Sequence, residues 1–305
     1  MCRDNVSLKA DGWNVAISAT PKTTELTKRL KAEGGFIITH VGKIERDDGS
    51  CFSSQEISEF FPCLHYFLSF TLGCWAGVAF PVGFDVDGSR VFEQWGLPMA
   101  SDGPWNGNYS WFDSHHGEIL PQVFPGFVAL WKSDLWHTPL TEALYFYLGA
   151  CSGSVEIGVD SGLILAQTAL ERIAWTYCVQ DRKMVSKEAF KPRGLSAANK
   201  LRLLVSSLGI PLSIPSSLPV LSAAPKASPS IKWQDGLDAI TGIRNAVVHP
   251  DPGTPLPEGS EYEGWLLSLW YIDMILLRLC GHTGKYANRL VPQRWVGTVE
   301  SVPWA

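Results

Sequence analysis

The sequence has few of the features that mark secreted proteins, proteins stabilised by a structural metal ion, or membrane-spanning proteins. Its seven cysteines are odd in number and widely scattered, and no two of them form a CxxC pair. We therefore expect neither a disulfide framework nor a structural zinc site. The most apolar run, residues 265–280, is shorter than a bilayer span and contains Asp273 and Arg278. This run predicts a buried helix and no membrane partner.

Other common signatures are also missing. The opening segment lacks a basic stretch followed by an apolar core, so no secretion signal is indicated. Together with the unpaired cysteines, this favours a reducing cytoplasm. The chain has no internal repeat, no Gly-rich phosphate loop and no Ser-His-Asp nucleophile pattern. No cofactor is therefore predicted.

Length and composition indicate a folded protein of two domains. The chain has 305 residues, and 46% of them are hydrophobic, which is ample for buried cores. The small, polar segment 151–158 marks the expected boundary. The predicted fold class is α+β: a β-rich N-terminal domain of unknown role with a few helices over residues 1–155, followed by an all-α helical bundle with a C-terminal tail over residues 156–305.

Charge is distributed unevenly along the chain. Residues 1–160 contain 10 Lys and Arg against 19 Asp and Glu, whereas residues 161–305 contain 15 against 11. Only the second half could attract a polyanion, and much of its excess lies within 181–202. The candidate nucleic-acid contacts there are Lys183, Lys187, Lys191 and Arg193, which would bind phosphates without sequence choice. The alternative is a solvated loop that keeps the protein soluble, because the basic residues do not alternate with aromatic ones.

The first half contains signals for strands, helices and turns. Runs rich in Val, Ile and aromatics predict strands at 13–18 and 36–41, with a helix at 23–33 between them. Ser53 and Glu56 form a capping box that starts a helix running to Gly73. Asp87-Gly88 predicts a two-residue hairpin within 76–95.

A Gly- and Pro-rich region with no helical period follows, so we expect further strands and ordered loops there. Its tryptophans are Trp95, Trp105, Trp111, Trp131 and Trp136. Their rings are expected to fill the core or rim of a sheet, with a base-stacking platform as the alternative. His115 and His116 lie near Asp113 and Glu118, but adjacent side chains in a strand point to opposite faces. A solvated loop is therefore predicted, and no metal site.

Helices dominate the expected second half. Apolar spacing predicts helices at 138–150, 160–180, 196–208 and 260–280, the last of them buried. Five prolines between Ile210 and Pro229 indicate a long connector that cannot be a helix.

The segment 235–250, DGLDAITGIRNAVVHP, carries the main functional candidate. Asp235 is a plausible N-cap, and Pro250 cannot continue a helix, so the helix is expected to close at His249. One apolar stripe is formed by Leu237, Ile240, Ile243 and Val247. A polar stripe on another face is formed by Asp238, Thr241, Asn245 and His249. Arg244 lies beside the polar stripe, and its long side chain can curl toward it.

The spacing of Arg244, Asn245 and His249 resembles the signature of the HEPN family. This family comprises helical bundles found in many prokaryotic RNases, toxins and defence proteins, and the resemblance covers about residues 159–289. It implies a metal-independent endoribonuclease that leaves 2',3'-cyclic phosphate ends. In that role Arg244 would bind the phosphate, His249 would move protons, and Asn245 would hold the imidazole or a non-bridging oxygen.

An in-line displacement needs a base and an acid, yet the motif provides one His per chain. A homodimer in which both copies line a shared groove would supply two, and HEPN RNases are generally arranged in this way. RNA is the expected substrate, and a toxin or defence effector the expected role. The sequence names no RNA target, trigger or neutralising partner.

Two alternatives remain at this stage. Some HEPN relatives bind nucleotides or partners without cleaving, and the acidic, aromatic-rich N-terminal half could be a sensor or interaction module. Alternatively, Arg244 only pairs with Asp238 or Glu171, and His249 merely complements the helix dipole.

Overall fold

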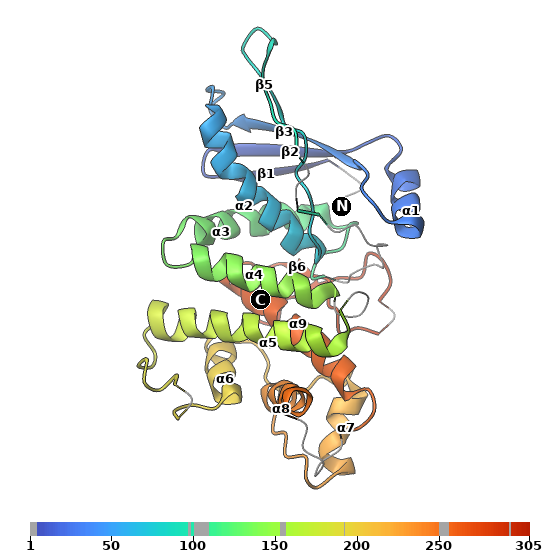
Figure 1. The fold of residues 1–305 in the computed structure, drawn as a ribbon, viewed down its shortest axis with the longest axis vertical. Helices are drawn as coiled ribbons and strands as arrows, with labels where there is room; N and C mark the ends of the chain where they lie inside the picture. The colour runs from blue at the N-terminus through green and yellow to red at the C-terminus, as the bar shows by residue number, and fades with distance from the viewer. Residues whose placement is uncertain are drawn as a thin grey trace.

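The fold is α+β, as predicted, with small sheets in the N-terminal part and helices dominating the remainder (Figure 1). The computed structural model describes residues 5–96, 99–100, 110–152, 157–191, 193–249, 256–292 and 294–305. Among these residues, no helix combines the length and apolar character needed to cross a bilayer.

The N-terminal sheet has three antiparallel strands in the order β1-β2-β3. Its strands are β1 (Val6–Ala10), β2 (Trp13–Ala19) and β3 (His40–Arg46), and α1 (Thr23–Glu33) connects the last two. Leu8 and Ile44 both pair with Val15, and β1 packs on α3. The strand predicted at 36–41 begins later, at His40, because its partner strand ends at Ala19 opposite that residue.

The capping box predicted at Ser53 is confirmed. The hydroxyl of Ser53 accepts from the amide of Glu56 at 3.2 Å, and the amide of Ser53 donates to the Glu56 carboxylate at 2.8 Å. Helix α2 (Ser54–Leu72) follows and ends at Gly73, whose φ of 67° is left-handed. The predicted hairpin is also present, as β4 (Val82–Phe84) and β5 (Arg90–Glu93), and it projects from the top of the molecule in Figure 1. Its strands are joined by residues 85–89 and not by two residues, because the amide of Asp85 donates to the carbonyl of Ser89 at 2.9 Å.

The prediction of strands and loops around the tryptophans was wrong for residues 117–132, which are helical. A short 3-10 turn, η1 (Gly117–Ile119), leads into helix α3 (Leu120–Lys132). The prolines of α3 argued against a helix in the sequence. However, Pro121 lies in the first turn, where a missing N–H group loses no helical hydrogen bond. The buried face consists of Leu120, Val123, Phe124, Phe127 and Val128. Trp111 and Trp136 are buried, whereas Trp95 is exposed, and Trp105 lies outside the described residues.

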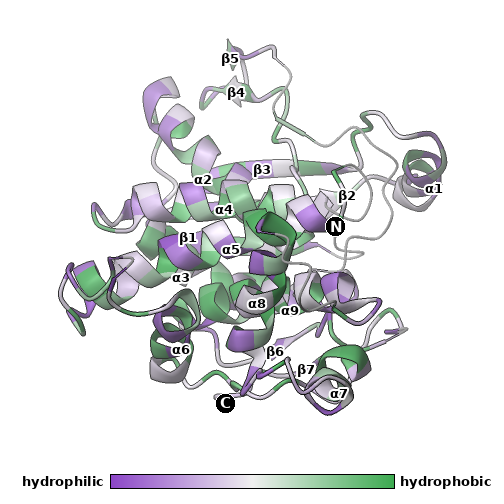
Figure 2. Cartoon of the chain, turned by 60° about the horizontal axis from the view of Figure 1, so that its bottom comes forward, coloured by the Kyte–Doolittle hydropathy of each residue, from purple (hydrophilic) through white to green (hydrophobic). Residues whose placement is uncertain are grey.

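The helices of the second part stack in layers beneath the sheet (Figure 1). They are α4 (His137–Cys151), α5 (Val159–Trp175) with its π-helical extension η3 (Thr176–Asp181), α6 (Ala197–Ser207), α7 (Pro219–Ala227), α8 (Gly236–Val248) and α9 (Ser260–Leu279). Helix α9 is largely buried, as predicted, and packs against α5, α8 and α4. Figure 2 shows hydrophobic residues concentrated where these helices meet. Helices α4 and α5 lie on either side of the predicted domain boundary at residue 155 and pack together. The boundary therefore stays a prediction.

Helix α7 corrects the prediction that residues 210–229 cannot be helical. Pro219 is at the first helical position, where a missing amide costs nothing. The buried carboxylate of Glu263 accepts from the amides of Val220 and Leu221 at 3.1 and 2.9 Å. A distant residue therefore satisfies the start of a short helix whose Leu221 is fully buried.

The C-terminal tail folds back over the N-terminal part. It contains the short strands β6 (Lys285–Tyr286) and β7 (Glu300–Ser301). The amide of Ala287 donates to the carbonyl of Trp111 at 2.7 Å. The carboxylate of Asp113 accepts from the amide of Gly297 at 2.9 Å. The tail thus ties the loop before α3 to the helical part.

Candidate functional site at the end of helix α8

Helix α8 has the bounds that its sequence predicts. The carboxylate of Asp235 accepts from the amides of Leu237 and Asp238 at 3.0 and 2.9 Å, which confirms the N-cap. The amide of His249 donates to the carbonyl of Asn245 at 2.7 Å and closes the helix. Arg244 and Asn245 therefore occupy the last turn, and His249 is the C-cap residue.

Close packing on α9 fixes the position of α8. A Cβ added to Gly264 would lie 2.8 Å from the Cδ1 atom of Ile243, and one added to Gly236 would lie 2.5 Å from the Tyr271 hydroxyl. The start of α8 thus lies beside the later part of α9, and its end lies near the start of α9. This antiparallel contact holds the motif end of α8 beside the first turns of α9.

The three motif side chains are accessible to different extents. Arg244 is half-buried, whereas Asn245 and His249 are exposed. Arg244 Nη1 donates to Asn245 Oδ1 at 3.2 Å. The buried Nε of Arg244 has no hydrogen-bond partner among the described residues. The end of α8 therefore presents an amide, an imidazole and part of a guanidinium group to solvent.

The structure divides the predicted polar stripe into two parts. Asp238 and Asp235 both bind Arg202 of α6, at 2.8 and 2.6 Å. Although burial opposes its ionisation, the hydrogen bond from Arg202 lowers the pKa of Asp235. The hydroxyl of Thr241 is buried and donates to the Leu237 carbonyl at 2.7 Å. Asn245 and His249 are the exposed end of the stripe, whereas Asp238 is only partly exposed, at 26% of its side chain.

The alternative pairings predicted for Arg244 are not seen. Asp238 is bound to Arg202, and the carboxylate of Glu171 accepts from the side-chain amide of Gln167 at 2.9 Å. All of these residues are described, and no ion pair joins either carboxylate to Arg244. The ion pairs that Arg202 forms with Asp235 and Asp238 were not predicted. In the sequence, Arg202 is only one of several basic residues within 181–202.

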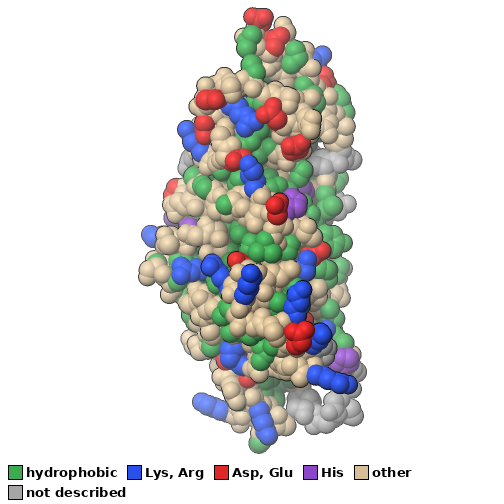
Figure 3. All heavy atoms as spheres, turned by 90° about the vertical axis from the view of Figure 1, so that its left-hand side faces the viewer, with side chains coloured by type: hydrophobic (Ala, Val, Ile, Leu, Met, Phe, Trp, Pro, Cys, Tyr) green, Lys and Arg blue, Asp and Glu red, His purple; other side chains and the backbone are tan. Residues whose placement is uncertain are grey.

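The predicted phosphate-binding residues lie on the loop between η3 and α6. Lys183, Lys187, Lys191 and Arg193 are all exposed. Lys191 lies 3.8 Å from Glu188, a solvent-exposed contact. Phe190 anchors the loop, because it is buried and its ring meets Trp175 edge-on at 5.7 Å between centroids. In Figure 3, Lys and Arg side chains gather over the lower half of the face, while Asp and Glu are concentrated in the upper half.

Two of the cavities on the described surface lie away from α8. One, of about 390 Å³, lies between α7, α9 and the C-terminal tail, and the other, of about 640 Å³, lies between the N-terminal sheet, α2 and the end of α3. Arg244, Asn245 and His249 line neither of them. The motif is thus presented at an exposed helix end.

Comparison with known proteins assigns the chain to a family. The model of the YopA C-terminal domain matches residues 133–301, and the model of the YopA central domain matches residues 1–106. The chain therefore belongs to the YopA family, and both α8 and the basic loop lie within the C-terminal match.

A similar protein is the SPbeta prophage-derived uncharacterized protein YopA of Bacillus subtilis (strain 168). The two chains are 30% identical over 306 residues, which cover 97% of this chain and 65% of that relative. The chain thus spans slightly less than two-thirds of the relative's length. No solved structure matches the chain.

Proposed function

We propose that this protein is a metal-independent endoribonuclease of the HEPN type, acting in the cytoplasm as a toxin or defence effector. The observation that carries the proposal is the joint exposure of Asn245 and His249 at the end of α8, beside a half-buried Arg244 that hydrogen-bonds to Asn245. The carboxylates considered as partners of Arg244, Asp238 and Glu171, are bound elsewhere. The motif is therefore open to a ligand.

The chemistry follows from the three side chains. One imidazole takes the proton from the ribose 2'-OH, whose oxygen forms a bond to phosphorus while the bond from phosphorus to the 5'-oxygen breaks. A second imidazole returns a proton to the leaving 5'-oxygen. The Arg244 guanidinium stabilises the charge on the phosphorane, and Asn245 orients an imidazole or a non-bridging oxygen. The products carry 2',3'-cyclic phosphate and 5'-OH ends.

Each chain supplies a single motif histidine, so the reaction requires a second copy. We propose a homodimer in which two α8 ends face each other across a two-fold axis and form one groove. An exposed motif outside both described cavities supports this arrangement, because a partner surface would complete the site. The basic loop, with Lys183, Lys187, Lys191 and Arg193, would contact RNA phosphates.

The toxin or defence role has two supports. The name of the similar Bacillus subtilis protein gives that relative a prophage origin. The proposed RNA cleavage would stop protein synthesis in the cell that makes the enzyme. Overexpression of the chain is therefore expected to arrest bacterial growth, and His249→Ala should abolish the arrest. A triggering or neutralising partner would be a further protein or ligand.

Cleavage of single-stranded RNA in the presence of EDTA tests the activity. His249→Ala should lower the rate by about 100-fold or more, as expected when a general acid or base is removed. His137→Gln, which changes another exposed histidine, should leave the rate unchanged. DNA should remain intact, since it lacks the 2'-OH. Equal rates for His249→Ala and the parent would rule out the proposed site.

A second candidate function is a non-catalytic binding or sensor module. The projecting hairpin favours it, because Phe84, Val91 and Trp95 are 65%, 66% and 76% exposed, and exposed apolar patches mark interaction surfaces. Nucleic-acid binding that is unaffected by Arg244→Ala, together with no RNA cleavage, would support this function instead.

A further inference from the structure

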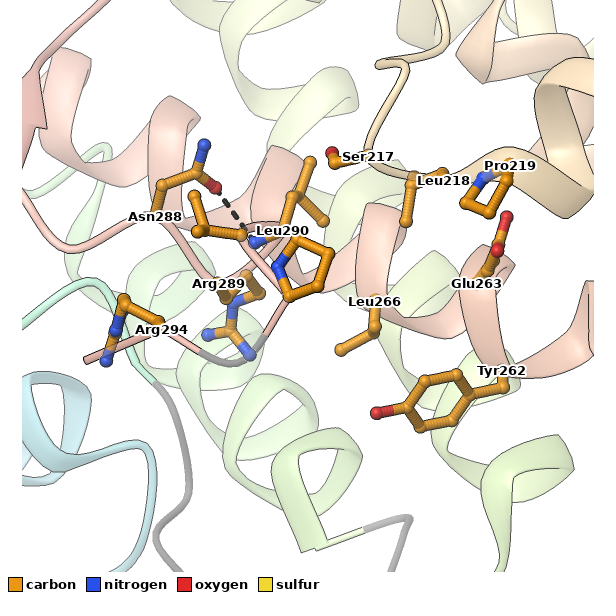
Figure 4. Close-up of a pocket in the computed structure, with 12 residues that line it drawn as sticks. Ser217, Leu218, Pro219, Tyr262, Glu263, Leu266, Asn288, Arg289, Leu290 and Arg294 are labelled. Atoms are coloured by element: carbon orange, nitrogen blue, oxygen red, sulfur yellow. Dashed lines mark hydrogen bonds between the residues drawn. The ribbon is translucent and has the colours of Figure 1, made fainter.

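The smaller of these two cavities combines cationic and apolar walls in one concave space that is open to solvent. It is lined by side chains of the α7 start, the first turns of α9 and the tail. Figure 4 shows Arg289 and Arg294 on one side, Tyr262 and Glu263 on the other, and Leu266 between them. Its volume of about 390 Å³ lies within the range of about 300–1,000 Å³ usual for small-molecule sites.

Arg289 is held rigidly at this wall. Its Nε and Nη2 donate to the two carboxylate oxygens of Asp273 at 2.6 and 3.0 Å, and Nη2 also reaches the Tyr147 hydroxyl at 2.9 Å. Nη1 takes no part in these bonds. Because the side chain is only 8% exposed, its guanidinium plane is fixed before any ligand arrives, which lowers the entropy cost of binding.

Arg294 is positioned from the other part of the chain. Its Nη1 donates to the carbonyl of Ser110 at 3.3 Å. Two guanidinium groups therefore line one end of the cavity. Each has five N–H donors in a planar fork, of which Arg289 uses three for Asp273 and Tyr147. This is the arrangement that recognises a phosphate or carboxylate group.

Glu263 does not oppose an anion at that end. Its carboxylate accepts from the amides of Val220 and Leu221, so its charge is matched by the N-terminus of α7. Figure 4 also places it on the side away from Arg294. The remaining wall is apolar, with Leu218, Leu266 and Leu290, and the ring of Tyr262 is 51% exposed.

We propose that this cavity binds a nucleoside monophosphate, with the phosphate at Arg289 and Arg294 and the base against the Tyr262 ring. The phosphate needs the guanidinium pair, and a flat base suits an exposed aromatic ring beside apolar walls. This ligand site is separate from the proposed cleavage site at α8, since the two share no residue.

Calorimetric titration of the full chain with AMP and UMP tests the proposal. Both should bind, while adenosine and inorganic phosphate, each carrying half of the contacts, should bind at least about tenfold more weakly. Arg294→Gln should weaken AMP binding about tenfold, as expected for loss of a charge-assisted bond. Tyr262→Leu should weaken it about fivefold or more through lost stacking.

Matched controls come from elsewhere on the surface. Arg90→Gln and Tyr145→Leu replace exposed residues outside the cavity and should leave AMP affinity unchanged. Arg244→Ala and His249→Ala should also bind AMP like the parent, which separates this site from the cleavage site. Arg289 is not varied, because removing one partner of a buried ion pair would disturb folding.

Three outcomes would overturn the proposal. The first is that neither AMP nor UMP binds at concentrations up to about 5 mM, where ordinary metabolite sites are filled. The second is that affinity survives both Arg294→Gln and Tyr262→Leu. The third is that Arg244→Ala abolishes binding, which would place the nucleotide at the end of α8.

Discussion

At the scale of single residues, Tyr147, Asp273 and Arg289 form a buried group that joins an ion pair to a hydroxyl. Although burial opposes its charge, the carboxylate of Asp273 raises the pKa of Arg289 above its ordinary value. Asp273→Asn would leave the buried guanidinium without its counter-charge. We expect the free energy of unfolding to fall by about 3–5 kcal/mol, measured by urea denaturation.

A control and a compensating pair complete this test. Asp134→Asn, on an exposed aspartate, should change the free energy of unfolding by less than about 0.5 kcal/mol. The double variant Asp273→Leu with Arg289→Met should recover much of the loss, because an apolar pair needs no counter-charge. A single Asp273→Asn variant as stable as the parent would contradict the assignment.

His116 gives the tail a pH dependence. Its Nδ1 lies 2.8 Å from Glu118 Oε1, and its Nε2 lies 2.9 Å from the Gly297 carbonyl, so both ring nitrogens face acceptors. The hydrogen bond to Glu118 raises the pKa of His116 above its ordinary value. The stabilisation is therefore fully present below the unfolded pKa of about 6.5, and it is lost as pH rises through the folded pKa.

Hydrogen exchange of the tail amides measures this effect. After correction for the intrinsic rate, residues 295–305 should become less protected as the pH rises through the folded pKa of His116. His116→Gln, which keeps hydrogen-bonding capacity but does not titrate, should remove the trend. If the same trend persists in His116→Gln, another group controls the docking of the tail.

At the scale of elements, Gly126 shows how closely α3 approaches the end of α9. A Cβ added there would lie 1.9 Å from the carbonyl oxygen of Cys280, a backbone atom that cannot rotate away. Gly126→Ala should therefore destabilise the protein by about 1–3 kcal/mol, although Ala normally favours a helix by about 0.5–1 kcal/mol over Gly. Thermal and urea unfolding measure the change.

Gly149 in α4 is the matched control for that substitution. A Cβ there would lie 3.0 Å from Leu165 Cδ1, the flexible end of a side chain that can move aside. Gly149→Ala should thus cost less than Gly126→Ala. The reverse order would show that α3 and α9 are not packed as closely as described.

The elements that the sequence predicted well are those whose signals are local. The caps at Ser53 and Asp235 each bind amides within three residues, and the structure confirms both of them. Helix α7 was missed because its first amides are satisfied by Glu263, which lies 43 and 42 residues away in sequence. The late start of β3 was likewise decided by the end of its partner strand.

The motif at the end of α8 shows the same division. Its position at the closing turn follows from Asp235 and from the apolar stripe, and both are confirmed. Which side chains of the polar stripe stay exposed depends on Arg202, which takes Asp238. Such a tertiary pairing between two helices leaves no trace in helical spacing.

At the scale of the whole molecule, the uneven charge predicts how RNA binding depends on salt. Replacing Lys183, Lys187, Lys191 and Arg193 with Gln should weaken binding and reduce the slope of log affinity against log salt by at most about 3, at about 0.7 per phosphate contact of a single strand. Fluorescence anisotropy in a non-cleaving His249→Ala background gives this slope.

The control for that measurement changes four basic residues, all of them lysines, in the acidic half. These are the exposed residues Lys9, Lys22, Lys28 and Lys43. Replacing them with Gln should leave the salt dependence of RNA binding nearly unchanged, because they lie on the N-terminal sheet and α1. Equal slopes for the two quadruple variants would assign the loop a solubility role only.

The proposed homodimer predicts how two inactive variants behave when they share one groove. An Arg244→Ala homodimer keeps both histidines but no motif arginine, and a His249→Ala homodimer keeps both arginines but no motif histidine. Their heterodimer alone combines one of each in the shared groove. Its rate should differ from that of either parent homodimer. Relative to His249→Ala it regains a proton carrier, and relative to Arg244→Ala it gains a phosphate-binding arginine but loses one of two histidines.

Co-expression of the two inactive chains with different affinity tags isolates the heterodimer by purification on both tags in turn. Cleavage of single-stranded RNA in EDTA is then compared with each parent homodimer at equal protein concentration. Independent sites in single chains would give only the mean of the two parent rates, since no chain carries both Arg244 and His249. That mean, or failure of the two tags to purify together, would refute a composite groove, and a site within one chain would then have to find its second proton carrier among the residues around the end of α8.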